Sequence, residues 1–171
     1  MQSALGPIIG PAKVHPENLD GRVAIVIGGA NGIGFEITRA LVHAGCKVIM
    51  VNRKQEQGDA ALETLRGEVP NAQVDWRGCD MGTLAEVRDV FSGLREELER
   101  LDFVACSAGI NAEQYGEVND GLDRHFAVNY LGHFYAVNQL WPLLRKTSRK
   151  GDGPKPRVVF LSSEQHRGTY Y

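Results

Sequence analysis

Three glycines in the stretch GGANGIG have a spacing that could hold a phosphate group. Gly28, Gly32 and Gly34 follow an apolar run at 23–27 and lead directly into a pattern that predicts a helix. The first glycine permits a tight turn, the second lets a phosphate reach the backbone, and the third allows close packing of helix and strand. Free N–H groups near Ile33, at the start of the helix, would face that phosphate. The spacing predicts a pyrophosphate site, although such a turn also forms without a ligand.

The residues after the second predicted strand select between nucleotides. An acidic side chain there would accept hydrogen bonds from a free ribose 2′-hydroxyl, whereas cations accommodate a 2′-phosphate. The sequence has Asn52, Arg53 and Lys54 at this place and no carboxylate. We therefore expect the cofactor NADP(H) rather than NAD(H); the alternative is that the two cations only begin a solvated helix face.

These side chains require a scaffold of alternating strands and helices. Apolar runs predict strands at 23–27, 47–51, 72–76, 102–106 and 157–161, and the segments between them predict helices from about 33 to 44, through 60–65, over 83–98 and from about 122 to 144. A basic loop rich in Gly and Pro is expected at 145–156. The pattern indicates an α/β fold, a Rossmann-type doubly wound parallel sheet with strand order 3-2-1-4-5. Residues 1–21, rich in Gly and Pro, predict an extended arm before a single domain over 22–171.

Composition excludes several classes of function. The 171 residues include 19 basic and 21 acidic ones, so no net field attracts nucleic acid. No apolar run is long enough to span a membrane, and the N-terminus lacks the pattern of a signal peptide. The five histidines are scattered, which predicts no metal site. The sequence has an odd number of cysteines, and all three lie in apolar contexts: Cys46, Cys79 and Cys106. This favours reduced thiols and a cytoplasmic location.

Four short motifs extend the pattern beyond the glycine turn. They are Cys79-Asp80-Met81 after the third predicted strand, Cys106-Ser107-Ala108-Gly109 at the end of the fourth, FAVNYLGHF in the last predicted helix, and Ser162-Ser163 after the fifth strand. Together these residues resemble the classical short-chain dehydrogenase/reductases, most of all their retinol-dehydrogenase-like and WW-domain oxidoreductase-like members. The resemblance covers about residues 22–166. It departs from the family at Cys106 and Ser107, where the family has two amides.

The resemblance implies a role for each matched residue. Asp80 would hydrogen-bond the adenine amino group, Ser107 would retain a polar contact near the cofactor, and Arg124 would contact the cofactor. Asn129 would kink its helix and hold a water molecule of the proton relay. Ser163 would polarise a substrate carbonyl. Asp80 could instead cap the following helix. The apolar neighbours of Asn129, which are Phe126, Val128 and Phe134, predict that its amide is partly buried. The implied reaction interconverts an alcohol and a ketone or aldehyde.

The family's proton donor is a Tyr followed four residues later by Lys, and the sequence contains no such pair. Tyr170 and Tyr171 come too soon after the fifth predicted strand to replace it. We therefore expect a chain that stops before this motif, with an incomplete sheet whose fifth strand is an exposed edge. The alternatives to an enzyme are a nucleotide-binding module without turnover or a fragment. The module could pair with a full-length relative through its exposed edge, and a homo-oligomer is the other possible assembly.

Overall fold

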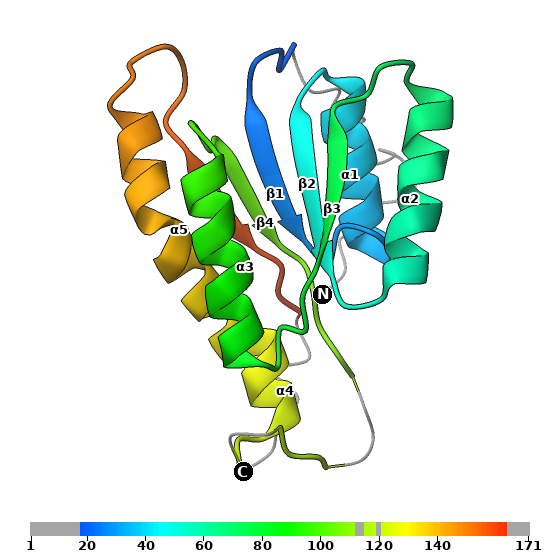
Figure 1. The fold of residues 1–171 in the computed structure, drawn as a ribbon, viewed down its shortest axis with the longest axis vertical. Helices are drawn as coiled ribbons and strands as arrows, with labels where there is room; N and C mark the ends of the chain where they lie inside the picture. The colour runs from blue at the N-terminus through cyan, green and yellow to red at the C-terminus, as the bar shows by residue number, and fades with distance from the viewer. Residues whose placement is uncertain (1–17, 112–114, 119–120, 164–171) are drawn as a thin grey trace, which may run out of the picture.

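The computed structural model describes residues 18–111, 115–118 and 121–163. In this part of the chain, five parallel strands form one sheet: β1 (Val23–Ile27), β2 (Lys47–Asn52), β3 (Val74–Gly78), β4 (Phe103–Cys106) and β5 (Arg157–Phe160). Their order is β3-β2-β1-β4-β5, with β3 and β5 at the edges (Figure 1). The predicted α/β class, parallel sheet and strand order are confirmed. Of the expected N-terminal arm, residues 1–17 lie outside the described residues.

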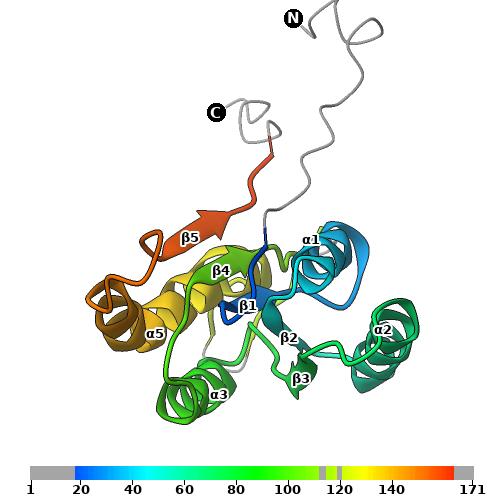
Figure 2. The same ribbon diagram turned by 90° about the horizontal axis from the view of Figure 1, so that it is seen from above.

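Helices cover both faces of the sheet. The helical elements are α1 (Gly32–His43), α2 (Gln55–Glu68), α3 (Leu84–Glu97), α4 (Arg124–Phe126), the π-helical turn η1 (Ala127–Leu131) and α5 (Gly132–Ser148). Figure 2 shows α1 and α2 on one side of the sheet and α3 and α5 on the other. This arrangement explains why β1 is an unbroken apolar run. Val23, Ile25 and Ile27 pack toward α3 and α5, whereas Ala24 and Val26 pack toward α1 and α2.

The third strand begins two residues later than predicted. Asn71 has a positive φ of 66°, and the Ala72 N–H donates to the Val69 carbonyl, so the chain is still turning where the strand was expected. The ladder with β2 then runs from Val74 to Gly78, so the strand also includes Arg77 and Gly78, which the predicted run left out.

The last helix ends four residues later than predicted, at Ser148 instead of Leu144. Thr147 is buried, its hydroxyl donates to the Leu143 carbonyl, and it accepts from the Leu101 N–H at 2.9 Å. These contacts hold the final turn in helical form, so residues 145–148 belong to α5 and the expected loop is shorter. Pro142 lies within α5 and is exposed.

Candidate functional site

The turn between β1 and α1 approaches the end of β4 at a distance that side chains would prevent. Gly28 has a φ of +85°, and a Cβ there would lie 2.6 Å from the Ala108 backbone nitrogen. A Cβ on Gly34 would collide with the Gly28 carbonyl and the Ser107 hydroxyl. Glycine is therefore required at both positions by the protein's own backbone, before any ligand is considered.

Gly32 differs from these two glycines because its missing side chain faces open space. Its φ is +55°, and a Cβ there would meet no described atom within 4 Å. It is the first residue of α1, and the preceding Asn31 caps the helix by accepting from the Gly32 N–H at 2.8 Å. Ile33 is 70% exposed, and the first turn of α1 carries no acidic residue. The positive end of a 12-residue helix thus faces an open hollow, a suitable place for an anion.

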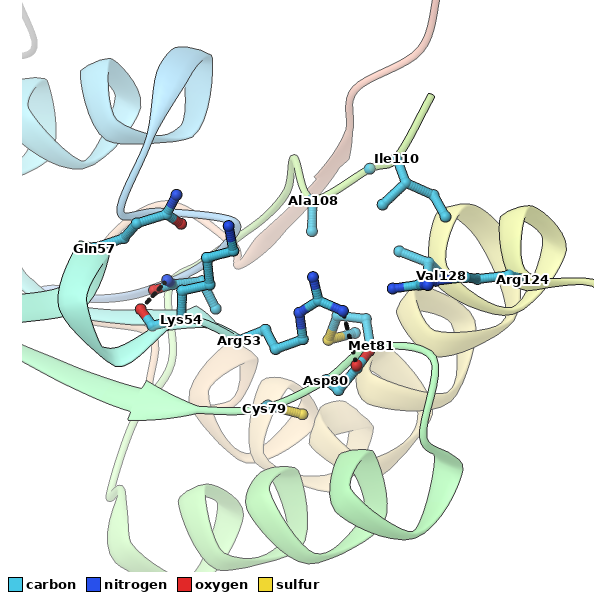
Figure 3. A pocket seen from close by; sticks show the side chains of 12 residues that line it. Arg53, Lys54, Gln57, Cys79, Asp80, Met81, Ala108, Ile110, Arg124 and Val128 are labelled. Atoms are coloured by element: carbon cyan, nitrogen blue, oxygen red, sulfur yellow. Dashed lines mark hydrogen bonds and ion pairs between the residues drawn. The ribbon is translucent and has the colours of Figure 1, made fainter. Parts of the chain in front are cut away.

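Two adjoining hollows form the candidate site. The first lies at the glycine turn and is lined by Gly28, Asn31, Gly32, Ile33, Gly34, Asn52, Gln57, Ser107, Ala108 and Gly109. The second, shown in Figure 3, is lined by Asn52, Arg53, Lys54, Gln57, Cys79, Asp80, Met81, Ala108, Gly109, Ile110, Arg124 and Val128. Asn52, Gln57, Ala108 and Gly109 line both, so the hollows are neighbours along the carboxyl ends of the strands. Ten of the twelve predicted site residues are brought together here; Asn129 and Ser163 are the exceptions.

Basic side chains reach into the second hollow from two directions. Arg53 extends from the turn between β2 and α2, and Arg124 extends from α4 on the other side (Figure 3). The Arg53 guanidinium lies 3.4 Å from an Asp80 carboxylate oxygen. Lys54 makes no ion pair with any residue that the structure describes. The hollow therefore has cationic groups at the place where the sequence predicts a 2′-phosphate.

Asp80 shapes the turn before α3 but does not cap that helix. Its second carboxylate oxygen accepts from the Gly82 N–H at 2.9 Å, and its carbonyl accepts from the Thr83 N–H. The N-cap residue of α3 is Thr83. The alternative that Asp80 caps α3 is therefore wrong, and its contact with adenine stays a prediction.

Ser107 joins two strands of the sheet. Its hydroxyl donates to the Ile27 carbonyl at 2.7 Å, and its backbone N–H donates to the same oxygen at 2.9 Å. The hydroxyl thus links the ends of β1 and β4 at a position where the family has an amide. It also lines the hollow at the glycine turn, so its predicted cofactor contact stays open.

Asn129 lies in η1 and is exposed, which corrects the expectation that its amide is partly buried. Of the three neighbours on which the expectation rested, Val128 is buried, but Phe126 and Phe134 are themselves about half exposed. The Asn129 side chain accepts from the Ile110 N–H at 2.8 Å and donates to the Ile110 carbonyl at 2.9 Å. It therefore holds the segment after β4 against the π-helical turn and borders the second hollow through Ile110.

Ser163 is separate from both hollows. It lies three residues beyond the end of β5, is exposed, and lines neither hollow. Tyr170 and Tyr171 lie outside the described residues. The two predicted catalytic residues thus do not line the two hollows as the other ten predicted site residues do.

Two residues near the site have hydrogen-bond partners that the sequence does not reveal. His133 on α5 is 3% exposed, and its Nε2 donates to the Ala108 carbonyl at 2.8 Å. Burial lowers the pKa of its imidazole, and the hydrogen bond to Ala108 opposes that shift only in part. Trp76 on β3 donates its indole N–H to the Asn52 side-chain oxygen at 2.6 Å. A single His in a helix or Trp in a strand is indistinguishable from a core residue until its partner is known.

Comparison with known proteins agrees with this geometry. Residues 22–170 match the short chain dehydrogenase family. The chain belongs to this family. Within it, the chain is 33% identical over 156 residues to the WW domain-containing oxidoreductase of Drosophila melanogaster, covering 90% of this chain and 36% of that protein. It is 35% identical over 149 residues to the polyprenol dehydrogenase of Danio rerio, covering 87% and 45%. It is 31% identical over 175 residues to human retinol dehydrogenase 13, covering 96% and 51%.

Solved structures of the short-chain dehydrogenase type share the fold. A Pseudomonas aeruginosa RhlG/NADP active-site complex is 28% identical with a TM-score of 0.69, covering 86% of this chain and 55% of that one. A short chain dehydrogenase from Salmonella enterica serovar Typhi is 26% identical with a TM-score of 0.73, covering 90% and 63%. The chain spans about half or less of the length of the three curated relatives described above. In the described residues, no helix is long and apolar enough to cross a membrane, and no group of side chains is arranged to hold a metal ion.

Proposed function

We propose that this chain binds NADP(H) as the cofactor-holding part of a short-chain dehydrogenase/reductase. The glycine cradle carries the proposal, because the open N-terminus of α1 fits a pyrophosphate and a Cβ at Gly32 would point into that space. Arg53 and Lys54 line the neighbouring hollow, and no acidic residue directly follows β2, which favours a 2′-phosphate over a free hydroxyl; the Asp80 carboxylate lies 3.4 Å from the Arg53 guanidinium in the same hollow. Asp80, Ser107 and Arg124 complete the lining of the two hollows. The NADP complex of a 28% identical structure supports the same preference.

The reaction that we propose interconverts an alcohol and a ketone or aldehyde of a small molecule. The nicotinamide cofactor would supply the hydride chemistry when it is bound. Two relatives that are 35% and 31% identical carry names that refer to alcohols, polyprenol and retinol. Within this chain, Ser163 would polarise the carbonyl and Asn129 would hold a relay water. The Tyr and Lys pair that would supply the general acid in this family is not among the residues of this sequence.

A second candidate function is a nucleotide-binding module without turnover. It is favoured by the same missing pair and by the exposed strand β5, through which the chain could pair with a second copy or with a full-length relative. In either case we propose a cytoplasmic location. All three cysteines are buried and none forms a disulfide, which suits a reducing compartment.

Calorimetric titration with NADPH and NADH, followed by an assay with carbonyl substrates, tests these proposals. We expect NADPH to bind more tightly than NADH. Replacing Gly32 by Val should abolish binding of both, because the side chain would occupy the phosphate's space and φ is positive there. Replacing Arg53 by Asp and Lys54 by Ala should move the preference toward NADH. Turnover would favour the enzyme, and binding without turnover would favour the module.

The control for the glycine substitution is Gly67→Val. Gly67 lies on α2 and lines neither hollow, and a Cβ added there would meet no described atom within 4 Å. This variant should bind NADPH as the unchanged protein does. If Gly32→Val also kept its affinity, the pyrophosphate assignment would be wrong.

A further inference from the structure

Trp76 lines neither hollow but makes a hydrogen bond to a residue that lines both. Its indole N–H donates to the Asn52 side-chain oxygen at 2.6 Å. Met50 is the register partner of Trp76 across the ladder between β2 and β3, so Asn52 is its diagonal neighbour on the same face. Trp76 is absent from the lining of both hollows, whereas Asn52 lines both. An interaction outside the site thus fixes a side chain inside it.

A second hydrogen bond connects the Asn52 side chain to the turn that carries Arg53 and Lys54. The Asn52 amide nitrogen donates to the Lys54 carbonyl at 3.1 Å, and the Gly58 N–H donates to the same carbonyl at 3.2 Å. Lys54 is the N-cap residue of α2 and has no side-chain cap of its own. The chain of contacts from Trp76 through Asn52 to Lys54 therefore sets the backbone between β2 and α2, where Arg53 stands.

Gly58 provides the space that this arrangement needs. A Cβ there would lie 2.5 Å from the indole nitrogen and 2.6 Å from two of its carbons, so the indole packs directly against the backbone of α2. The Trp76 indole is therefore held both by its packing against α2 and by its hydrogen bond to Asn52 on β2. This packing makes the indole a fixed donor rather than a mobile one.

We propose that Trp76 is a positioning residue that sets the preference for NADP(H) over NAD(H). The inference rests on the proposed NADP(H) function. The turn that Trp76 fixes presents Arg53 and Lys54, which line only the second hollow and would engage a 2′-phosphate. The hollow at the glycine turn shares Asn52 and Gln57 with it, but is otherwise lined by the β1–α1 turn and the residues after β4. Holding the cations in place beforehand lowers the ordering cost of binding the 2′-phosphate. Losing the indole donor should therefore weaken the binding of NADPH more than the binding of NADH.

Trp76→Phe tests this by removing the N–H while keeping an aromatic ring. The dissociation constants of NADPH and NADH are measured by calorimetry on the full chain. We expect NADPH binding to weaken about two- to tenfold, the range for one lost hydrogen bond, and NADH binding to change by less than about twofold. The matched control is Trp141→Phe, since Trp141 is the only other tryptophan and lies on α5 away from both hollows. It should leave both constants unchanged.

A double-mutant cycle separates action through Asn52 from a general loss of packing. In an Asn52→Ala background, Trp76→Phe should produce no further change in the ratio of the two constants. A second measurement needs no cofactor. The protein has two tryptophans, so its NMR spectrum has two indole N–H signals, and Trp76→Phe identifies the signal of Trp76 by removing it. Asn52→Ala should shift that same signal. If Trp76→Phe does not fold, Gly58→Ala displaces the indole from the helix side and should shift the ratio in the same direction.

The outcomes distinguish the inference from the proposed function. Equal weakening of NADPH and NADH in Trp76→Phe, an unchanged ratio, or the same further loss in the Asn52→Ala background would overturn the role of Trp76 alone. If the unchanged chain shows no preference for NADPH, the proposed cofactor specificity fails, and the inference fails with it.

Discussion

His133 is an ionisable side chain that the site's backbone holds in one tautomer. Its Nε2 must carry the proton that it donates to the Ala108 carbonyl, and its Nδ1 has no partner among the described residues. Burial disfavours the charged imidazole and lowers its pKa below the ordinary value of 6.5. The histidine is therefore neutral in the folded protein at neutral pH, and it fixes the carbonyl of a residue that lines both hollows.

This geometry predicts a pH dependence of stability. Because the folded-state pKa of His133 is below 6.5, the unfolded chain binds the proton more tightly. The contribution of His133 is thus fully present above about pH 6.5 and is lost as the pH falls below it, with a slope of at most about 1.4 kcal/mol per pH unit. His133→Gln keeps a donor for Ala108 but does not titrate. Urea unfolding between pH 7 and pH 5 should show a shallower decline in this variant, and equal slopes would contradict the prediction.

A site residue is predictable from the sequence where only one residue type fits the backbone. Gly28 and Gly34 are recognisable because any side chain would collide with neighbouring chain atoms. His133 and Trp76 were missed because their importance comes from a single hydrogen bond to a residue distant in sequence. No local pattern of residue types encodes such a partner.

The π-helical turn η1 links the last helix to the end of β4. Asn129 makes this link with two hydrogen bonds to the Ile110 backbone, and the extra residue of a π turn shifts the side chains around it. The resemblance implied a kink at Asn129, and the π turn lies at that residue. Periodicity alone predicted a continuous helix, because five residues are too few to alter the pattern of the apolar face.

Removing the Asn129 amide should loosen this connection between elements. We expect Asn129→Ala to lower the free energy of unfolding by about 0.5–1.5 kcal/mol, less than two buried hydrogen bonds would give because the side chain is exposed. The matched control is Asn138→Ala on α5, an exposed asparagine whose side chain has no hydrogen bond to another described residue. Chemical denaturation measures both variants, and equal effects would show that the two contacts with Ile110 add nothing to stability.

The order of the strands was predictable because it follows from chain direction and buried apolar runs, whereas element ends depend on individual contacts. Strand β1 is buried along its whole length, so its limits coincide with the apolar run. The start of β3 depends on the left-handed conformation of Asn71, and the end of α5 depends on the Thr147 hydroxyl. Neither determinant is visible in a hydrophobic pattern.

Of the two edge strands of the described sheet, β5 is the one that exposes large apolar side chains. Strand β5 pairs only with β4 among the described strands, and Val159 and Phe160 are 54% and 56% exposed. An exposed strand with apolar side chains offers both unpaired backbone groups and apolar area to another chain. The sequence prediction of an exposed, apolar fifth strand is confirmed in this respect. The 171-residue chain should therefore self-associate through this edge.

Replacing Val159 and Phe160 together by Lys should weaken that association. Charged side chains on an edge strand oppose strand pairing between molecules, while Val158, which packs against the core, is left in place. Sedimentation velocity over a range of concentrations should show a self-association constant reduced by about tenfold or more, the equivalent of roughly 1.4 kcal/mol. Tyr115→Lys is the control, because Tyr115 is 73% exposed but lies in the segment between β4 and α4. If only Tyr115→Lys changed the association constant, the contact would involve the segment between β4 and α4 and not the sheet edge. If neither variant changed it, the next surface to substitute would be the row of stacked aromatic rings formed by Phe126, Tyr130 and Phe134.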